Sequence, residues 1–287
     1  MTPSVGSRTL LVHDSAKDLS FPVWIMYPTQ VPSHREPFGP YSMDVSPDAP
    51  PDGGLRPLVV ISHGGGSTPL VLRTIGSYLA KNGFVVALPE HPGNNRRDNS
   101  LENTIENLEH RPRHISLAID TVISDPDLAG HMLPDEVAVI GHSLGGYTAL
   151  AVAGGQPWSG MDQPIRVTPD TRIKALVLLA PATGWFVPNH SLRNVRLPIL
   201  LLIGEHDHIT PRWQAQLVLD LVPDRDQVTF RVIENAGHFS FLSPFPPAMQ
   251  SAGLPPAMDP EGFDRKQFHE QLHEQLRAFL NQTLRHL

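Results

Sequence analysis

The 287-residue sequence contains no cysteine, and this absence excludes several kinds of site. A chain without thiols forms no disulfide bond, has no cysteine nucleophile and builds no zinc site on thiolate ligands. Proteins without disulfides are typical of a reducing compartment, so the sequence favours a cytoplasmic location.

Long apolar runs and an excess of positive charge are also missing. No stretch approaches the roughly 18 uncharged apolar residues of a membrane-spanning helix, and we expect no signal peptide in residues 1–15 because a long apolar region is lacking. Lys and Arg number 22 against 29 Asp and Glu, which gives a net charge of −7. We therefore expect neither a membrane nor a nucleic acid as partner, because no basic surface is available to neutralise phosphates.

Proline, in contrast, is abundant, with 30 residues. Many of them lie in two segments, 28–57 and 244–260. Proline has no amide donor for a helix interior or a sheet ladder, so both segments are predicted to be surface loops. The length and the globular composition fit one large α/β domain over residues 1–287.

Between the proline-rich segments, the hydrophobic pattern predicts alternating strands and helices. Two runs, 8–13 and 20–27, are typical of an antiparallel pair. Runs that are apolar on both faces, as in parallel strands covered by helices, lie at 58–61, 84–88, 137–140, 175–180, 199–203 and, as a weaker candidate, 228–233. Helices are predicted at 69–81, 112–124, 143–153, 211–221 and 263–285. The pattern indicates an α/β fold with a doubly wound, mostly parallel sheet and an antiparallel N-terminal pair, whose chemistry lies past the carboxyl ends of the strands.

The most specific motif runs directly from a predicted strand into a predicted helix. It reads Gly141-His142-Ser143-Leu144-Gly145. A G-x-S-x-G pattern in this context is typical of a nucleophile elbow, in which a strained turn projects the serine hydroxyl above the sheet. Ser143 is therefore predicted to be a nucleophile; the alternative is a glycine-rich turn with an incidental serine.

A serine nucleophile needs a base, and the base needs an acid that orients it. In proteins with a nucleophile elbow, the acid follows the serine in the chain and the histidine follows the acid. Asp207 follows the 199–203 strand and His238 follows the 228–233 strand, so we predict these two roles for them. Glu205 is the alternative acid, because side chains two apart on a strand point to the same face; for His238 the alternative is a surface histidine.

An acyl-transfer site also needs donors for the oxyanion. The backbone N–H of Leu144 is predicted as one donor, since it follows the nucleophile. Gly65, with Gly64 as a close alternative, is predicted as the other, because glycines after the 58–61 strand let the backbone approach a substrate. No Gly-Lys-Ser/Thr follows these glycines, which excludes a phosphate-binding loop.

Several further residues are candidates for the substrate pocket or for charge recognition. The pocket candidates are His63, Gly64, His91, His142, Trp185 and Phe239. His63 and His91 follow strand ends, and their alternative role is to hold their own turns. Arg96, Arg97, Arg111 and Arg113 could recognise a carboxylate, but a solvated surface is favoured for them.

The segment 239–262 follows His238 directly and contains six prolines, too many for a predicted helix or central strand. Long loops in compact domains are usually functional or disordered. Two interpretations stay open: the segment, together with residues 184–190, covers the pocket and contributes to substrate choice, or it is a solvated connector.

A second motif, His269-Glu270-Gln271-Leu272-His273, matches H-E-x-x-H. Two histidines one turn apart on a helix can hold zinc. No convincing third ligand follows, and the helix is rich in Glu, Gln and Arg, so we interpret the motif as a solvated helix face and predict no metal site.

Taken with their order, these motifs resemble the α/β-hydrolase superfamily over nearly the full chain: SHGGG at 62–66, GHSLGG at 141–146 and AGHFSF at 236–241. More narrowly, residues 78–95 and 106–120 resemble the dienelactone-hydrolase-like group, which includes platelet-activating-factor-acetylhydrolase-like proteins. Dienelactone hydrolases use a cysteine nucleophile, which this chain lacks, so dienelactone is a poor substrate candidate. The resemblance implies hydrolysis of a small-molecule ester, lactone or amide without metal or organic cofactor.

Other functions remain open at this point. Amidases, peptidases and acyltransferases use the same triad, because all pass through an acyl-enzyme. A non-catalytic binding protein of the same fold is less favoured, since all three triad residues are present. A metalloprotease built on His269 and His273 is the least favoured.

Overall fold

The computed structural model describes residues 4–160, 162–251 and 253–284. The strands of these residues are β1 Ser4–Asp14, β2 Leu19–Thr29, β3 His34–Phe38, β4 Tyr41–Pro47, β5 Arg56–Ser62, β6 Val85–Pro89, β7 Met132–His142, β8 Trp158–Gly160, β9 Gln163–Pro164, β10 Ile173–Leu179, β11 Ile199–Gly204 and β12 Val228–Ile233. The helices are α1 Arg73–Lys81, α2 Ile105–Ser124, α3 Leu144–Val152, α4 Arg212–Leu221, α5 Pro247–Ser251 and α6 Arg265–Thr283.

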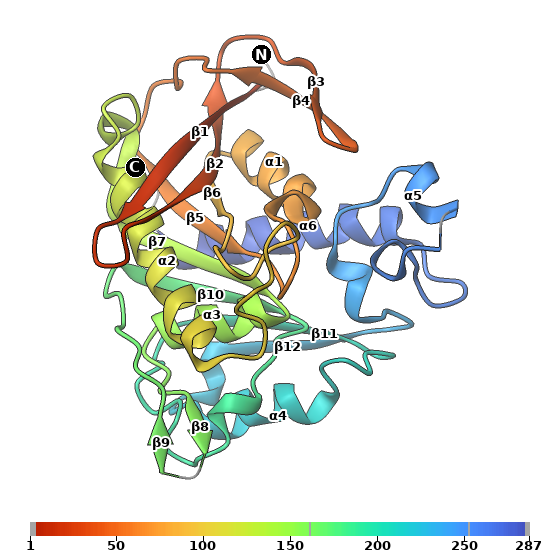
Figure 1. Cartoon of the computed structure of the whole chain (residues 1–287). Helices are drawn as coiled ribbons and strands as arrows, with labels where there is room; N and C mark the ends of the chain where they lie inside the picture. Colours follow the sequence, from red (N-terminus) through yellow and green to blue (C-terminus); the bar gives the residue numbers. More distant parts are fainter. Residues whose placement is uncertain (1–3, 161, 252, 285–287) are drawn as a thin grey trace.

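Ten of the strands form one sheet in the order β12-β11-β10-β7-β5-β6-β2-β1-β4-β3 (Figure 1). The strands from β12 to β6 are parallel. β2 pairs antiparallel with both β6 and β1. These pairings confirm the predicted fold class, a mostly parallel sheet with an antiparallel N-terminal pair.

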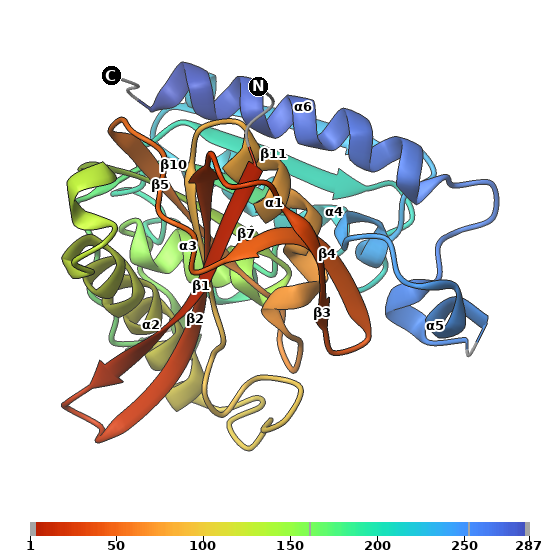
Figure 2. The same cartoon turned by 90° about the horizontal axis from the view of Figure 1, so that it is seen from above.

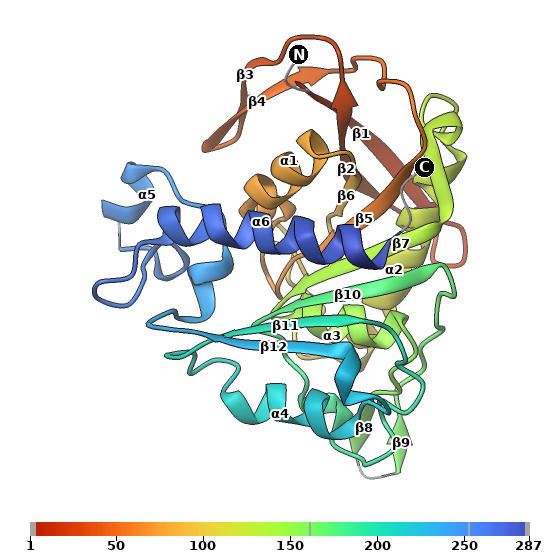
Figure 3. The same cartoon turned by 180° about the vertical axis from the view of Figure 1, so that it is seen from behind.

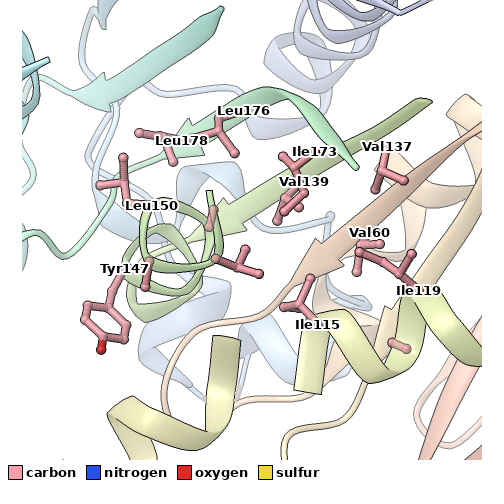
Figure 4. Packing of buried hydrophobic residues seen from close by; sticks show 14 of the residues in the cluster. Val60, Ile115, Ile119, Val137, Val139, Tyr147, Leu150, Ile173, Leu176 and Leu178 are labelled. Atoms are coloured by element: carbon pink, nitrogen blue, oxygen red, sulfur yellow. The ribbon is translucent and has the colours of Figure 1, made fainter. Parts of the chain in front are cut away.

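Helices cover both faces of the sheet (Figures 1 and 3). α1 and α6 lie on one face, and α2, α3 and α4 lie on the other. Successive strand residues alternate between the two layers: Val60 packs toward α2 and α3, whereas Val59 and Ile61 pack toward α1 and α6. Figure 4 shows Val60 facing Ile115 and Ile119 of α2. Each fully buried side chain of this kind contributes about 1.5–3 kcal/mol to folding.

The sheet changes its winding direction between β5 and β7, which are neighbours although β6 separates them in the chain. β5 leads into α1 on one face, and β7 leads into α3 on the opposite face. In doubly wound sheets the loops at such a point diverge and leave a crevice beyond the carboxyl ends of the two strands. Ser62 pairs with Gly141 there, so the glycine-rich loop and the elbow lie side by side.

Helix α2 begins at Ile105, seven residues before the predicted start at residue 112, so that boundary was wrong. The Thr104 side chain caps the helix by accepting a hydrogen bond from the Asn107 amide at 3.1 Å. Pro112 lies inside the helix and cannot donate to the Leu108 carbonyl. The Tyr147 hydroxyl donates to that carbonyl instead, at 3.0 Å, which explains how the helix tolerates the proline.

The two proline-rich segments contain more regular structure than predicted. In segment 28–57, β3 and β4 form an antiparallel hairpin at the edge of the sheet, where strands tolerate proline. In segment 244–260, α5 starts at Pro247 and a 3₁₀ helix at Pro255. Prolines are tolerated in the first turn of a helix because that amide needs no partner. Figure 2 shows α5 at the end of the molecule where α6 begins.

The small antiparallel pair of β8 and β9 was not predicted. Among the described helices, none combines the length and the apolar character that crossing a bilayer requires.

Candidate active site

The residue between β7 and α3 is Ser143, and its backbone is strained. Its φ is 55° and its ψ is −121°, a conformation that costs a residue other than glycine about 1–3 kcal/mol. The Ser143 amide donates to the Leu179 carbonyl at 3.1 Å, and its carbonyl accepts from the amides of Gly146 at 2.8 Å and Ala182 at 2.9 Å. These bonds hold the turn in the geometry expected of a nucleophile elbow.

Two glycines of the motif are required by close packing. A methyl group on Gly141 would lie 2.1 Å from the Gly145 carbonyl oxygen. One on Gly145 would lie 2.0 Å from the carbonyl oxygen of Ser62. No larger residue fits at either position without moving β7, α3 or β5, so the spacing of the motif follows from the packing of these elements.

His238 contacts Asp207 in the loops that follow β12 and β11. The His238 Nδ1 lies 2.8 Å from the Asp207 Oδ2, and both residues are buried, with 5% and 6% of their surface exposed. Asp207 also accepts hydrogen bonds from the amides of Ile209 at 2.9 Å and Thr210 at 2.8 Å. The carboxylate is therefore fixed in the orientation in which it faces the imidazole.

The hydrogen bonds of Asp207 also set its charge. Burial alone would raise the pKa of the carboxyl, but the hydrogen bonds from His238 and Thr210 favour the charged form and lower the pKa below its usual value. Asp207 is thus an anion at neutral pH. The alternative acid, Glu205, is exposed and accepts from the Asn235 amide at 2.8 Å.

Ser143 borders two cavities. One, of about 250 Å³, is also lined by His238 and by the predicted pocket residues Gly64, His142 and Phe239. The other, of about 600 Å³, is lined by Gly65, Leu144 and the predicted pocket residue Trp185. A third cavity, of about 700 Å³, lies between β12 and α6, and none of the predicted catalytic residues lines it.

His63 and His91 do not line either cavity that Ser143 borders, so their prediction as pocket residues was wrong. Both are fully buried beneath the glycine-rich loop. His63 Nδ1 lies 2.7 Å from the Gly64 carbonyl, and His91 Nε2 lies 2.9 Å from the Ser62 Oγ. Burial, with the charge of Arg111, lowers the pKa of His63 to about 3, so this histidine is neutral.

Of the arginines predicted to lie on a solvated surface, only Arg111 differs; Arg96, Arg97 and Arg113 are exposed as predicted. Arg111 is fully buried on the apolar face of α2, and Arg113 pairs with Asp14 at 2.7 Å. Arg96 is exposed at the edge of the smaller cavity. The burial of Arg111 was detectable in principle, because it is four residues before Ile115 and so shares that residue's face of the helix.

The H-E-x-x-H motif lies on α6, and the interpretation of its first histidine as solvated was wrong. His269 is 2% exposed, with its Nε2 3.2 Å from the Ser240 carbonyl. His273 stacks on Tyr78 with the ring centroids 4.9 Å apart. Within residues 4–160, 162–251 and 253–284, no group of three or more His, Cys, Asp or Glu side chains is placed to hold a metal ion.

The chain is similar to several known hydrolases. Residues 53–191, just under half of the chain, match the family described as serine aminopeptidase, S33. Cutinase est1 from Thermobifida alba is 24% identical over 185 residues, which cover 63% of this chain and 53% of that protein. Cutinase 2 from Thermobifida cellulosilytica is 26% identical over 185 residues, 63% of this chain and 60% of that protein. The chain thus spans between about half and three fifths of the length of these relatives.

The structural likeness extends over more of the chain. A ferulic acid esterase from Streptomyces cinnamoneus matches 98% of this chain and 90% of its own, with a TM-score of 0.71 and 20% identity. At that identity the likeness establishes the fold, and it does not test the narrower resemblance to the dienelactone-hydrolase-like group. From the sheet order, the elbow geometry and the structural likeness, we conclude that the chain has the α/β-hydrolase fold.

Proposed function

We propose that the protein is a serine hydrolase that cleaves carboxylic esters, with Ser143 as nucleophile, His238 as base and Asp207 as acid. The observation that carries the proposal is the buried His238–Asp207 contact of 2.8 Å beside a cavity that His238 shares with the strained Ser143. The names of the similar proteins, cutinases and a ferulic acid esterase, support ester hydrolysis.

In the proposed reaction, the Ser143 Oγ attacks the ester carbonyl carbon while its proton passes to the Nε2 of His238. Asp207 accepts the Nδ1–H of His238, so it holds the required tautomer and stabilises the imidazolium. The imidazolium then protonates the leaving alcohol as the carbon–oxygen bond breaks, which leaves an acyl ester on Ser143. Water attacks that ester with the same proton transfers and releases the carboxylic acid.

The negative oxygen of each tetrahedral intermediate needs two donors, and we propose the amides of Leu144 and Gly65. Leu144 is the first residue of α3, where amides have no acceptor within the helix. A methyl group on Gly65 would lie 3.4 Å from the Leu144 side chain, so the two residues are neighbours. Gly64 is the alternative second donor, because the corresponding distance to the Ser143 Cβ is 3.3 Å.

A second candidate is hydrolysis of an amide or peptide bond by the same residues. The match of residues 53–191 to a serine aminopeptidase family favours it. The proposed mechanism uses side chains and backbone amides alone, so we expect no metal or organic cofactor to be needed. The cytoplasmic location and the narrower dienelactone-hydrolase-like resemblance stay predictions.

The test combines covalent labelling with turnover. The purified protein is treated with a fluorophosphonate probe and assayed on p-nitrophenyl esters beside matched p-nitroanilides. We expect labelling that is lost in Ser143→Ala, and faster cleavage of esters than of amides. Amide cleavage that equals or exceeds ester cleavage would favour the second candidate, and labelling that persists in Ser143→Ala would contradict the assignment of the nucleophile.

A further inference from the structure

Two cavities meet at Ser143, and they differ in which catalytic residue they contain. His238 lines the smaller cavity of about 250 Å³, whereas Leu144, one of the two proposed oxyanion donors, lines the larger one of about 600 Å³; Gly65, the other proposed donor, lines both. The proposed chemistry assigns a direction to each. The leaving oxygen must lie within hydrogen-bond reach of the His238 Nε2 to receive its proton. The oxyanion points to the amides of Leu144 and Gly65, so the remaining substituent, the acyl chain, extends away from His238.

The walls of the two cavities differ as well. The smaller cavity is mainly apolar beyond the catalytic residues, with Val71, Phe239, Leu242, Phe245 and Leu254 in its lining. The larger cavity combines apolar side chains with polar ones, among them Asn94, Asn103 and Asn107, and the exposed Glu102 lies at its edge. A short apolar group suits the smaller cavity, and a bulkier group that carries uncharged polar atoms suits the larger one.

One of these polar residues lacks a partner. Asn107 is 3% exposed, and its side-chain oxygen accepts no hydrogen bond from the described part of the chain. A buried amide oxygen without a partner destabilises the fold, and a ligand group that donates to it removes that cost. By contrast, the neighbouring Asn94 already accepts from Arg111 at 2.7 Å and donates to Asn99 at 2.8 Å. Asn107 is therefore a buried side chain of this cavity that is available to bind a substrate.

We propose that the larger cavity binds the acyl part of the substrate, that the smaller cavity binds a short alcohol part, and that Asn107 binds a hydroxyl group on the acyl part. A hydroxyl both donates and accepts, so it suits either edge of the carboxamide. The proposal rests on the proposed ester hydrolysis and adds the substrate class: esters of short alcohols with bulkier, hydroxylated acids.

The test varies the two halves of the substrate separately. One series keeps the alcohol and changes the acid, with and without a hydroxyl group; the other keeps the acid and lengthens the alcohol. Asn107→Leu should lower kcat/KM for hydroxylated acids by on the order of ten-fold relative to unsubstituted ones, and leave the alcohol series unchanged. The matched control is Asn281→Leu, an exposed asparagine on α6.

Val71→Phe, which fills the smaller cavity, should reduce the rate for longer alcohols and leave the acid series unchanged. If that variant does not fold, Leu254→Trp, at a half-buried residue of the same wall, tests the assignment. If Val71→Phe or Leu254→Trp changes the rates of the acid series alone, the assignment of the two cavities to the two halves of the ester is reversed. If Asn107→Leu keeps the wild-type preference for hydroxylated acids, the proposed role of Asn107 is wrong. A wild-type protein that cleaves no ester and takes no fluorophosphonate would instead contradict the proposed function itself.

A separate observation concerns Arg111, which is fully buried without a carboxylate within hydrogen-bond distance in the described residues. Its guanidinium donates to the side chains of Thr148 at 3.0 Å, Asn94 at 2.7 Å and Ser62 at 3.3 Å, and to the His63 carbonyl. Burial lowers the pKa of Arg111 to about 9, which leaves it charged at neutral pH.

The partners of Arg111 all belong to elements that place the proposed oxyanion donors. The His63 carbonyl precedes the glycine-rich loop, and a methyl group on Gly65 would lie 3.8 Å from the Asn94 side chain. Thr148 donates to the Leu144 carbonyl at 3.0 Å. We infer that Arg111 is a positioning residue for the oxyanion donors, and that its charge, which no carboxylate neutralises, favours the negative transition state.

Arg111→Met should lower kcat and the rate of fluorophosphonate labelling together, by on the order of 10²- to 10³-fold, with KM within a few-fold of wild type. Arg111→Lys keeps the charge and should recover part of the loss. Arg113→Lys, on the same helix but paired with Asp14 at the surface, is the matched control and should keep the wild-type kcat. If Arg111→Met does not fold, Thr148→Val removes one contact and should lower kcat less. A folded Arg111 variant with a lower melting temperature but unchanged kcat would overturn the inference.

Discussion

Two buried histidines, His238 and His269, both belong to recognisable sequence motifs, yet their surroundings differ. His238 has a carboxylate at 2.8 Å and borders the cavity that Ser143 lines. His269 lies 3.2 Å from the Ser240 carbonyl and 3.4 Å from the Thr74 hydroxyl, at the contact between α6 and its neighbours. The comparison teaches that burial and a matching motif do not distinguish the two histidines, whereas an acidic partner and access to a cavity do.

The largest expected effect concerns Ser143, the proposed nucleophile, which lines the same cavity as His238. Ser143→Ala should lower kcat by on the order of 10⁶-fold, as loss of a triad nucleophile does, and leave the fold intact because the side chain shrinks by one atom. Steady-state kinetics on the ester that the wild type cleaves fastest measure kcat, and a thermal unfolding curve checks that the fold is intact. Activity near that of the wild type would contradict the assignment of Ser143 as nucleophile, and with it a chemical role for His238.

The next effect separates the two carboxylates near His238. Asp207→Asn should lower kcat by on the order of 10⁴-fold, because an amide favours the wrong histidine tautomer and does not stabilise the imidazolium. Glu205→Gln should change kcat by less than a few-fold, since Glu205 is exposed and contacts the Asn235 amide. Steady-state kinetics of the two variants, measured side by side, show which carboxylate is the acid. A larger loss in Glu205→Gln than in Asp207→Asn would assign the role to Glu205.

Much of this site could be predicted from the sequence because its parts are local. The strand β12 has the predicted bounds, and the elbow, Asp207 and His238 lie at or a few residues beyond the carboxyl ends of predicted strands. Parallel strands bring their carboxyl ends to one edge, so residues that are distant in the sequence meet there. The arrangement of the proposed triad thus follows from the order of the strands.

The errors concern contacts made by long side chains and by prolines. Nothing local reveals that Arg111 finds Thr148 and Asn94, because these partners are 37 and 17 residues away. Pro112 lies within a helix because Tyr147, on another helix, bonds to the free carbonyl. The contacts of Arg111 and the position of Pro112 in a helix depend on residues that are distant in the sequence, and a single sequence does not show which distant residues meet.

The free energy of unfolding should depend on pH through the buried histidines that, like His269, lie outside the proposed His238–Asp207 pair. Burial lowers the pKa values of His63, His114, His142 and His269 to about 3, while in the unfolded chain they titrate near the ordinary value of 6.5. The unfolded state therefore binds more protons below pH 6.5, and the free energy of unfolding falls as the pH decreases from about 6.5 to about 3. Each histidine contributes at most about 1.4 kcal/mol per pH unit.

Urea unfolding between pH 8 and pH 4 measures this dependence. His269→Gln replaces a histidine for which we propose no catalytic role. This variant should reduce the slope of the free energy of unfolding against pH and leave turnover unchanged. A free energy of unfolding that is constant from pH 7 to pH 5 would show that these histidines are not held in the neutral state.

A smaller effect is expected from the loop that links the two regions. Residues 239–251 and 253–256 follow His238 and wall the smaller cavity through Phe239, Phe245 and Leu254. The Pro256 carbonyl accepts a hydrogen bond at 2.9 Å from Arg265, the first residue of α6. Replacing residues 246–258 with a short Gly/Ser linker should change relative rates across the alcohol series by a few-fold, because part of the wall is lost. Labelling of Ser143 by the fluorophosphonate should persist. Unchanged relative rates with a lower melting temperature would make this segment a connector.

The smallest expected effect is that of metal removal. For zinc to bind at the H-E-x-x-H motif, His269 and His273 would have to turn one nitrogen each toward a single point. The ring nitrogens of His269 face Ser240 and Thr74, and its ring stands at 89° to that of His273, which stacks on Tyr78. Prolonged treatment with a chelator should therefore leave kcat/KM unchanged. Activity that is lost on chelation and restored by added zinc would instead assign a catalytic role to the His269 region, and the distinction between the two histidines would no longer hold.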